Sequence, residues 1–205
     1  GDEASAIRYI RSGLERVRGN IRIIPFVVGK SVSIIGRDEV EKWCEEKLEA
    51  NPRDFNMNAI MINIALRAEK YNSALKYVDK CLGIAATNKD LKTTYAMQKA
   101  NVLSAAYDKT SDKEYLKQAV RQYKSLLAEQ PKNITVLNNL AYLLAENDIE
   151  LDKALEYANK IYEGDAGNPN LVDTYGYVLY KNGKYSESLR CLRMALQLFD
   201  DSVLP

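Results

Sequence analysis

The sequence contains few of the side chains on which catalysis and metal binding usually depend. None of its 205 residues is a histidine, so the commonest general base and a leading zinc ligand are missing. Its three cysteines, Cys44, Cys81 and Cys191, lie far apart and form no CxxC pair, so neither a zinc ribbon nor a thioredoxin-type site is supported. Cys81 and Cys191 lie among apolar residues, and we expect buried hydrophobic side chains there rather than reactive thiols.

Two short motifs resemble functional sites but lack the context that such sites need. Gly29-Lys30-Ser31 ends like a phosphate-binding P-loop, but that loop requires a glycine five residues earlier, where Ile24 stands, and a preceding strand. Asn133-Ile134-Thr135 is a formal glycosylation sequon, although Asn133 is better explained as a helix cap after Pro131. We therefore predict no catalytic residue, no metal site and no cofactor, and an enzyme only if a catalytic domain lies outside this chain.

The charge balance limits the classes of partner. Lysine and arginine number 29 against 28 aspartate and glutamate residues, which gives a net charge of +1. A general nucleic-acid binder needs an excess of positive charge, and no basic run suggests a membrane surface. No apolar stretch has the length of a membrane span. We expect no nucleic acid and no membrane span, and leave the compartment open between the cytoplasm and, if a leader was removed, the periplasm or envelope.

The elements that position the side chains follow a repeat. Small or apolar residues recur at intervals of 34, 34, 45, 35 and 34 residues: Ala6, Val40, Ala74, Ala119, Ala154 and Ser188. A period near 34 predicts a stack of similar helical units, which favours binding over catalysis. Packed helices need small residues where their backbones approach most closely, and this explains the residue types at these positions.

The last unit shows the repeat most clearly. Asn168 can cap a helix that begins at Pro169, where the missing N–H is harmless. Asn182-Gly183 ends this helix, and apolar spacing predicts a second helix over 185–198. The unit is therefore a predicted helix–turn–helix.

Three stretches share one residue pattern, which resembles the tetratricopeptide repeat. In the last unit the matching residues are Tyr175, Gly176, Leu179, Gly183, Lys184, Tyr185, Ser188, Leu192 and Ala195. Residues 137–161 repeat the pattern with one extra residue in the turn, and residues 55–86 supply a third copy. The family usually has alanine where Ser188 stands. Pro52 and Pro131 lie where the family often has a proline at the end of its second helix.

The resemblance implies an all-α fold, a right-handed α-solenoid of stacked antiparallel helix pairs. We expect a single repeat domain over 1–205, in which 1–20 is an orphan second helix of an upstream repeat. The expected repeats cover 21–54, 55–88, 89–133, 134–168 and 169–205. A solenoid edge without a polar capping helix exposes apolar surface, so we expect a piece of a longer protein, with self-association through the repeat ends as the alternative.

Residues 21–35 contain many β-branched side chains, and their propensity favours a strand. The repeat on both sides predicts a helix instead, with Pro25 in its first turn and Gly36 at its end. Asp38 and Glu41 are then expected to cap the next helix as a pair.

The 45-residue interval contains 11 extra residues. We expect a longer helix over 90–107 and a turn over 108–112, with Ser111 and Glu114 as a capping box. The extra length is either a harmless elongation or a protrusion that contacts a partner.

The resemblance also implies a binding face, because in this family the first helices of the units line a concave groove. Carrying the groove pattern over residue by residue gives Asn56, Asn63, Arg67, Asn101, Asn138, Asn139, Tyr142, Asp173, Thr174, Tyr177, Tyr180 and Lys181. Asparagine amides suit an extended peptide backbone, and tyrosine supplies rigid apolar area with a polar tip. Ordinary solvated helix positions are the alternative interpretation.

We predict a non-catalytic protein–protein interaction scaffold or adaptor that binds a partner peptide or domain in this groove. Some family members bind a chaperone's C-terminal carboxylate through a lysine and arginine clamp. Asn63 and Arg67 fit that clamp loosely, but Ala59 stands where it needs lysine, so we do not expect it. Self-association through the open ends and RNA binding are the alternatives, and the near-neutral charge argues against RNA.

Overall fold

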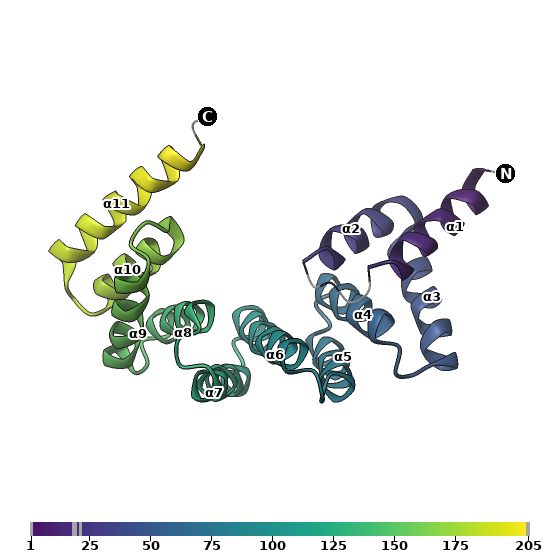
Figure 1. Cartoon of the computed structure of the whole chain (residues 1–205), viewed down its shortest axis with the longest axis horizontal. Helices are drawn as coiled ribbons and strands as arrows, with labels where there is room; N and C mark the ends of the chain where they lie inside the picture. The colour runs from purple at the N-terminus through teal and green to yellow at the C-terminus, as the bar shows by residue number, and fades with distance from the viewer. Residues whose placement is uncertain (1, 18–19, 21, 204–205) are drawn as a thin grey trace. The chain divides into compact units, whose positions relative to one another are not determined.

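The computed structural model describes residues 2–17, 20 and 22–203. These residues form eleven α-helices and no strand (Figure 1). In chain order the helices are α1 (Asp2–Glu15), α2 (Ile24–Ile35), α3 (Arg37–Ala50), α4 (Phe55–Arg67), α5 (Tyr71–Ile84), α6 (Lys89–Thr110), α7 (Lys113–Glu129), α8 (Ile134–Glu146), α9 (Leu151–Gly164), α10 (Pro169–Lys181) and α11 (Tyr185–Val203). No helix in this described part is long and apolar enough to cross a bilayer.

The helices group into two compact units, which are described separately. Unit 1 covers Gly1–Leu116 and unit 2 covers Lys117–Pro205, so the division falls inside α7. The expected repeat boundaries stay a prediction, and the boundary between 1–20 and 21–54 falls beside residues 18, 19 and 21, which lie outside the described residues.

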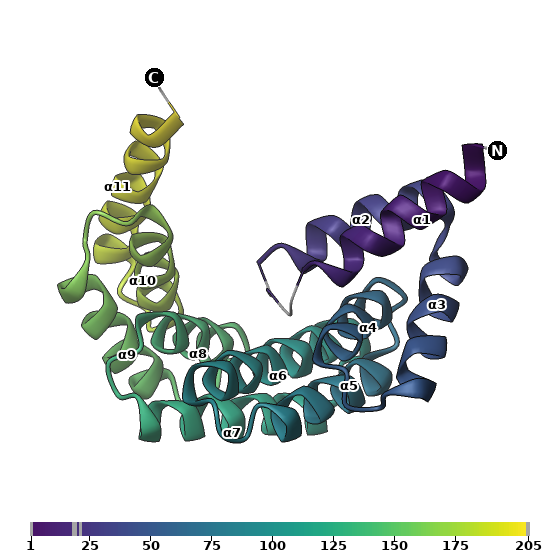
Figure 2. The same ribbon diagram turned by 45° about the vertical axis from the view of Figure 1, so that its right-hand side comes forward.

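Unit 1 is built around α2, α3, α4 and α5. Figure 2 shows α1 alongside α2, and α2 in turn packs against both α3 and α4. Leu14 of α1 and Trp43 of α3 are buried in the shared core. Ion pairs also join α1 to α3, with Glu15 Oε1 2.8 Å from Lys47 Nζ and Arg11 Nη2 2.5 Å from Glu39 Oε1.

The prediction of a helix over the β-branched segment is confirmed. Pro25 stands in the first turn of α2, where a backbone N–H has no acceptor within the helix, so the N–H that proline lacks is not needed. Gly36 ends the helix with a φ of 84°. Ile24 and Val28 are buried at 1% and 0% exposure, so burial against α3 and α4 outweighs local propensity.

The predicted capping pair of the next helix is wrong. Gly36 is itself the N-cap of α3 and makes no side-chain cap, so Asp38 already lies inside the first turn. Glu41 instead lies 3.6 Å from Lys70 Nζ. The physical reason is that a single residue separates α2 from α3, which leaves no room for a longer cap.

α6, the predicted longer helix, ends three residues later than the expected range of 90–107. α6 continues to Thr110, and Ser111 terminates it in a left-handed conformation with φ 57°. Asp112 Oδ1 accepts a hydrogen bond of 2.9 Å from the Glu114 backbone N–H. Asp112 therefore caps α7, and the predicted Ser111–Glu114 capping box is wrong.

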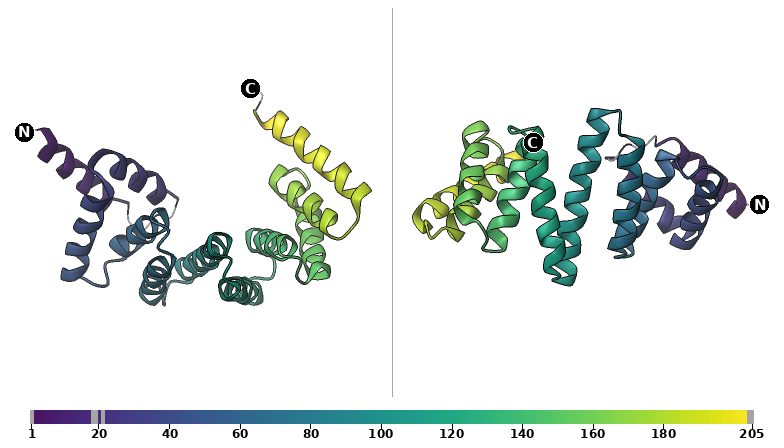
Figure 3. Two further views of the ribbon diagram at one scale, coloured as in Figure 1. Left: turned by 180° about the vertical axis from the view of Figure 1, so that it is seen from behind. Right: turned by 90° about the horizontal axis from the view of Figure 1, so that it is seen from below.

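Unit 2 consists of successive helices joined by short turns (Figure 3). α8 packs against α9, α10 packs against α8 and α9, and α11 packs against α10. The side chains of Asn133 and Asn168 accept hydrogen bonds from the first turns of α8 and α10, as predicted. Gly183 has a φ of 75° in the turn before α11, which runs five residues beyond the predicted end.

The recurring small or apolar residues are buried from Val40 onward, whereas Ala6 is half-buried. Ala154 and Ala74 are fully buried, and Ser188 is buried at 3% exposure. The Ser188 hydroxyl donates a hydrogen bond of 2.7 Å to the Gly176 carbonyl oxygen, which satisfies the polar group that replaces alanine. A Cβ at Gly176 would lie 2.8 Å from Leu192 Cδ2, so only glycine fits there without a shift.

Candidate functional site

The candidate site lies on unit 2, where α8 and α10 pack together. Residues three or four apart on a helix share one side. We call the resulting surface the α8–α10 face; it comprises Asn138, Asn139, Tyr142, Glu146, Asp173 and Tyr177. All of these except Glu146 belong to the predicted row.

A tyrosine pair joins the two helices of this face. The ring centroids of Tyr142 and Tyr177 lie 5.4 Å apart at an interplanar angle of 30°, which is within the range of favourable aromatic contacts. Tyr142 is 47% exposed, so the pair presents apolar surface to solvent. We call these two rings the tyrosine platform.

Glu146 fixes the orientation of this platform. The Tyr177 hydroxyl donates a hydrogen bond to the Glu146 carboxylate, which lies one helical turn after Tyr142. Burial, this hydrogen bond and the Glu146 charge together raise the pKa of Tyr177. The hydroxyl therefore stays protonated and remains a donor across the physiological range.

Polar groups surround the platform. Asn138 Oδ1 is buried and has no hydrogen-bond partner among the described residues, which is uncommon for a buried acceptor. Asp173 is exposed, one turn before Tyr177. Beyond Tyr177, Lys181 Nζ lies 2.7 Å from Asp148 Oδ1, so this lysine is already paired.

Two further predicted residues of α10 have surroundings different from those of Tyr177. Thr174 is only 6% exposed and belongs to the packed interior, so we leave it out of the α8–α10 face. The Tyr180 ring lies 5.7 Å from the ring of Tyr185, the first residue of α11.

The predicted row on unit 1 mainly holds unit 1 together. Asn56 Nδ2 donates to the Glu15 carbonyl oxygen of α1 at 3.2 Å, and Arg67 Nη2 donates to the Pro25 carbonyl oxygen of α2 at 2.9 Å. Asn63 Nδ2 donates to Ala59 within its own helix at 3.2 Å. Asn101 is exposed on α6. At least Asn56 and Arg67 already bind this chain's own backbone.

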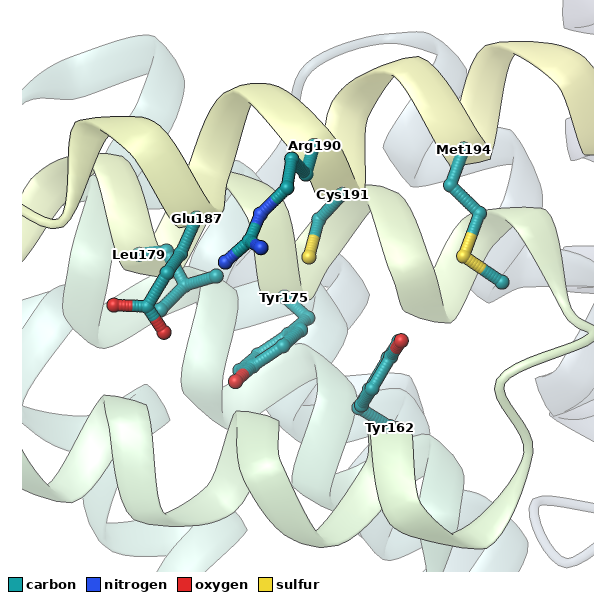
Figure 4. Close-up of a pocket in the computed structure, with 7 residues that line it drawn as sticks. All are labelled: Tyr162, Tyr175, Leu179, Glu187, Arg190, Cys191 and Met194. Carbon is teal, nitrogen blue, oxygen red and sulfur yellow. The ribbon is translucent and has the colours of Figure 1, made fainter.

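A hollow of about 340 Å³ lies between α9, α10 and α11 (Figure 4). Its lining residues are Tyr162, Tyr175, Leu179, Glu187, Arg190, Cys191 and Met194. The rings of Tyr162 and Tyr175 are stacked with centroids 4.6 Å apart. Because Tyr175 precedes Tyr177 by two helical positions, the hollow and the α8–α10 face lie on opposite sides of α10.

The hollow contains one thiol, that of Cys191. Burial raises the pKa of the Cys191 thiol, so the sulfur is a poor nucleophile at neutral pH. No group of three or more potential metal ligands occurs in the described part of the chain.

Comparisons with known proteins identify the fold. No protein-family model matches the chain. A TPR repeat-containing protein of Pseudomonas aeruginosa is 31% identical over 86 residues, which make up 42% of this chain. The chain covers only 15% of the length of that relative. The structure of MamA from Desulfovibrio magneticus RS-1 superposes with a TM-score of 0.67 at 15% identity, covering 100% of this chain and 99% of that one. The chain has the tetratricopeptide-repeat fold.

Further solved structures share this tetratricopeptide-repeat fold. A thermophilic TPR protein of Thermus thermophilus has a TM-score of 0.60 at 18% identity, covering 87% of this chain and 91% of that one. YrrB, described as a TPR protein with an unusual peptide-binding site, has a TM-score of 0.55 at 15% identity, covering 94% and 93%. The predicted all-α solenoid class and the resemblance to this family are confirmed.

Sequence reasoning missed Glu146 and the hollow. Glu146 had a detectable signal, since it lies four residues after Tyr142 and therefore on the same side of α8. The hollow had none, because its lining comes from three helices whose spacing depends on packing.

Proposed function

We propose that unit 2 is a non-catalytic protein-interaction module that binds an extended segment of a partner protein on its α8–α10 face. The observation that carries this proposal is the tyrosine platform, Tyr142 against Tyr177, which Glu146 holds in place. A rigid, partly exposed aromatic surface binds with little loss of side-chain entropy.

The polar groups beside the platform suit a peptide backbone. Asn139 of α8 carries a side-chain amide with donor and acceptor atoms, and an extended segment offers backbone N–H and C=O groups at regular intervals.

The charges on the face favour a basic or neutral segment over an acidic one. Glu146 and Asp173 contribute two carboxylates to the face, and the Asp148–Lys181 ion pair lies beyond Tyr177. An acidic segment would meet like charge, whereas a lysine or arginine near Asp173 would gain a favourable interaction. We therefore expect partner segments with an apolar side chain over the tyrosine platform and a basic residue beside it.

The fold is consistent with this role. YrrB, which has the same fold, is described as carrying a peptide-binding site. At 15% identity the likeness concerns the fold and not the residues of that site. The proposal for this chain depends on its own side chains.

A selection experiment tests the proposal. A random peptide library displayed on phage would be selected against the wild-type protein, and the affinity of an enriched peptide would be measured by calorimetry. We expect Tyr142→Ala to weaken that binding at least tenfold without a large change in melting temperature. Tyr9→Ala removes a ring that is 72% exposed on α1 and serves as the matched control, with unchanged affinity. Equal affinity of wild type and Tyr142→Ala for every enriched peptide would contradict the proposal.

A further inference from the structure

The hollow between α9, α10 and α11 lies beside Cys191, a short side chain at a position where the other units carry longer ones. The residues three positions after the recurring small or apolar residue are, in chain order, Tyr9, Trp43, Tyr77, Gln122, Tyr157 and Cys191. Four of these six are aromatic, and only Cys191 is short. A short side chain alone does not predict a hollow, because neighbouring helices can close up around it. Beside Cys191 a space of about 340 Å³ remains.

The earlier units show which chemical group occupies this position. Tyr157 of α9 is half-buried and packs against the cluster of Leu137, Ile161 and Leu171. Tyr77 of α5 is likewise half-buried against the core of unit 1. The chain therefore packs an aromatic ring at the position that the short thiol side chain of Cys191 takes on α11.

The residue three positions further along each helix also differs. On α5 and α9 it is a lysine, and Lys80 Nζ and Lys160 Nζ lie 5.0 and 5.9 Å from the ring centroids of Tyr77 and Tyr157. On α11 the same position holds Met194, which lines the hollow. A thioether makes favourable contacts with the edge of an aromatic ring, so α11 keeps a partner for a ring that it does not itself carry.

The remaining walls of the hollow combine apolar surface with two opposite charges. Tyr162 and Tyr175 supply stacked rings, and Leu179 adds aliphatic surface. Figure 4 shows Glu187 and Arg190 toward one end of the hollow and Met194 toward the other. Neither Glu187 nor Arg190 has an ion-pair partner among the residues that the structure describes.

We propose that this hollow binds a free aromatic α-amino acid, with the ring of the ligand beside Cys191 and Met194. The carboxylate of the ligand accepts hydrogen bonds from the Arg190 guanidinium, and its ammonium group donates to the Glu187 carboxylate. Small-molecule pockets measure about 300 to 1,000 Å³, so a hollow of about 340 Å³ suits a ligand of this small size. The site lies on the side of α10 opposite the α8–α10 face and does not depend on peptide binding.

Nuclear magnetic resonance of isotope-labelled methionine methyl groups tests the proposal with L-phenylalanine as the probe. Of the four methionines only Met194 lines the hollow, whereas Met57, Met61 and Met97 lie on unit 1 and serve as internal controls. We expect a saturable shift of the Met194 signal, caused by the ring current of the ligand, and no shift of the other three.

Three competitors separate the contributions of the ring and of the two charges. L-leucine keeps both charges but lacks the ring, hydrocinnamate lacks the ammonium group, and phenethylamine lacks the carboxylate. Each should displace phenylalanine only at a concentration at least tenfold above that of unlabelled L-tyrosine.

Two variants act on the protein side. Cys191→Tyr gives α11 the ring that α5 and α9 carry, so it should fill the hollow and abolish the Met194 shift with little change in melting temperature. Gln122→Tyr is its matched control, because it adds a tyrosine at the equivalent position of α7, and it should bind like the wild type. Arg190→Gln should weaken binding at least tenfold, whereas Arg193→Gln changes an exposed arginine outside the hollow and should not.

The outcomes that would overturn the proposal are distinct. They are the absence of a saturable Met194 shift, undiminished binding by folded Cys191→Tyr or Arg190→Gln, and displacement by leucine as strong as that by tyrosine. Tyr142→Ala should leave phenylalanine binding unchanged, so failure here is distinguishable from failure of the peptide-binding proposal.

Discussion

Replacing Ala154 with glutamate would place a carboxyl group at a fully buried position of α9, between α8 and α10. Full burial raises a carboxyl pKa by about 3 to 5 units, to above about 7, so the folded state binds a proton at neutral pH. The ionisation cost is then set by the roughly 2.7 units between the unfolded pKa of about 4.3 and pH 7, and at about 1.36 kcal/mol per unit it is about 3.7 kcal/mol. The added atoms overpack the contact by about 1 to 3 kcal/mol more. Since domains are stable by about 5 to 15 kcal/mol, we expect unit 2 to lose most of its stability.

The pH dependence of this variant has a defined sign. The carboxyl pKa is raised in the folded state above its unfolded value of about 4.3, so the unfolded state ionises first as the pH rises. The ionisation part of the penalty is therefore absent below about pH 4 and grows until the pH passes the folded pKa. Relative to the wild type, Ala154→Glu should be least destabilised in acid.

Urea unfolding followed by circular dichroism at neutral and acidic pH measures both effects. Ala154→Ser is the matched control, because Ser188 occupies the equivalent position of the next unit and is hydrogen-bonded there. We expect that control to unfold within about 1 kcal/mol of the wild type. If Ala154→Glu were as stable as the wild type at neutral pH, the repeat register and the helix contact derived from it would be wrong.

Three further predictions concern side chains of known environment. Ser188→Ala removes one buried hydrogen bond and should lower the free energy of unfolding by about 1 kcal/mol, measured by urea titration; an unchanged midpoint would contradict it. In the native protein a thiol reagent should label Cys191 first, because burial raises the pKa of both Cys44 and Cys81 to about 12; rapid labelling of all three would contradict the buried positions. The raised pKa of Tyr177 means that its contribution to stability is present below its ordinary value of 10.0 and is lost as the pH rises further, so the wild type should lose more stability than Tyr177→Phe in alkaline urea titrations.

Much of the fold was predictable because the repeat imposes it. The small residues at Ala154 and Ser188 lie at helix contacts, and the caps at Asn133 and Asn168 form as expected. Even the segment around Pro25, whose propensity favours a strand, is helical because its apolar residues are buried between neighbouring helices.

Helix ends were less predictable, because adjacent residues can cap equally well. Ser111 and Asp112 are both good N-cap residues, and the choice depends on where α6 stops. A one-residue separation between α2 and α3 likewise removed the role expected for Asp38. These outcomes depend on tertiary packing, which a local sequence pattern does not record.

The candidate site was predictable only in part. Tyr142 and Tyr177 lie together on neighbouring helices, as the family's pattern implies. Asn56 and Arg67 instead hydrogen-bond to the backbone of α1 and α2, contacts between residues about forty positions apart that no local pattern specifies. Only the structure shows that Asn56 and Arg67 hold unit 1 together, whereas Tyr142 on unit 2 faces solvent.

The most direct test of the proposed peptide-binding role is a nuclear magnetic resonance titration of the isotope-labelled protein with a library-selected peptide. The α8–α10 face predicts the largest amide shift changes at Asn139, Tyr142 and Tyr177, with small changes on α9 and α11. Shift changes centred on the hollow beside Tyr162 and Cys191, with the tyrosine platform unaffected, would contradict it.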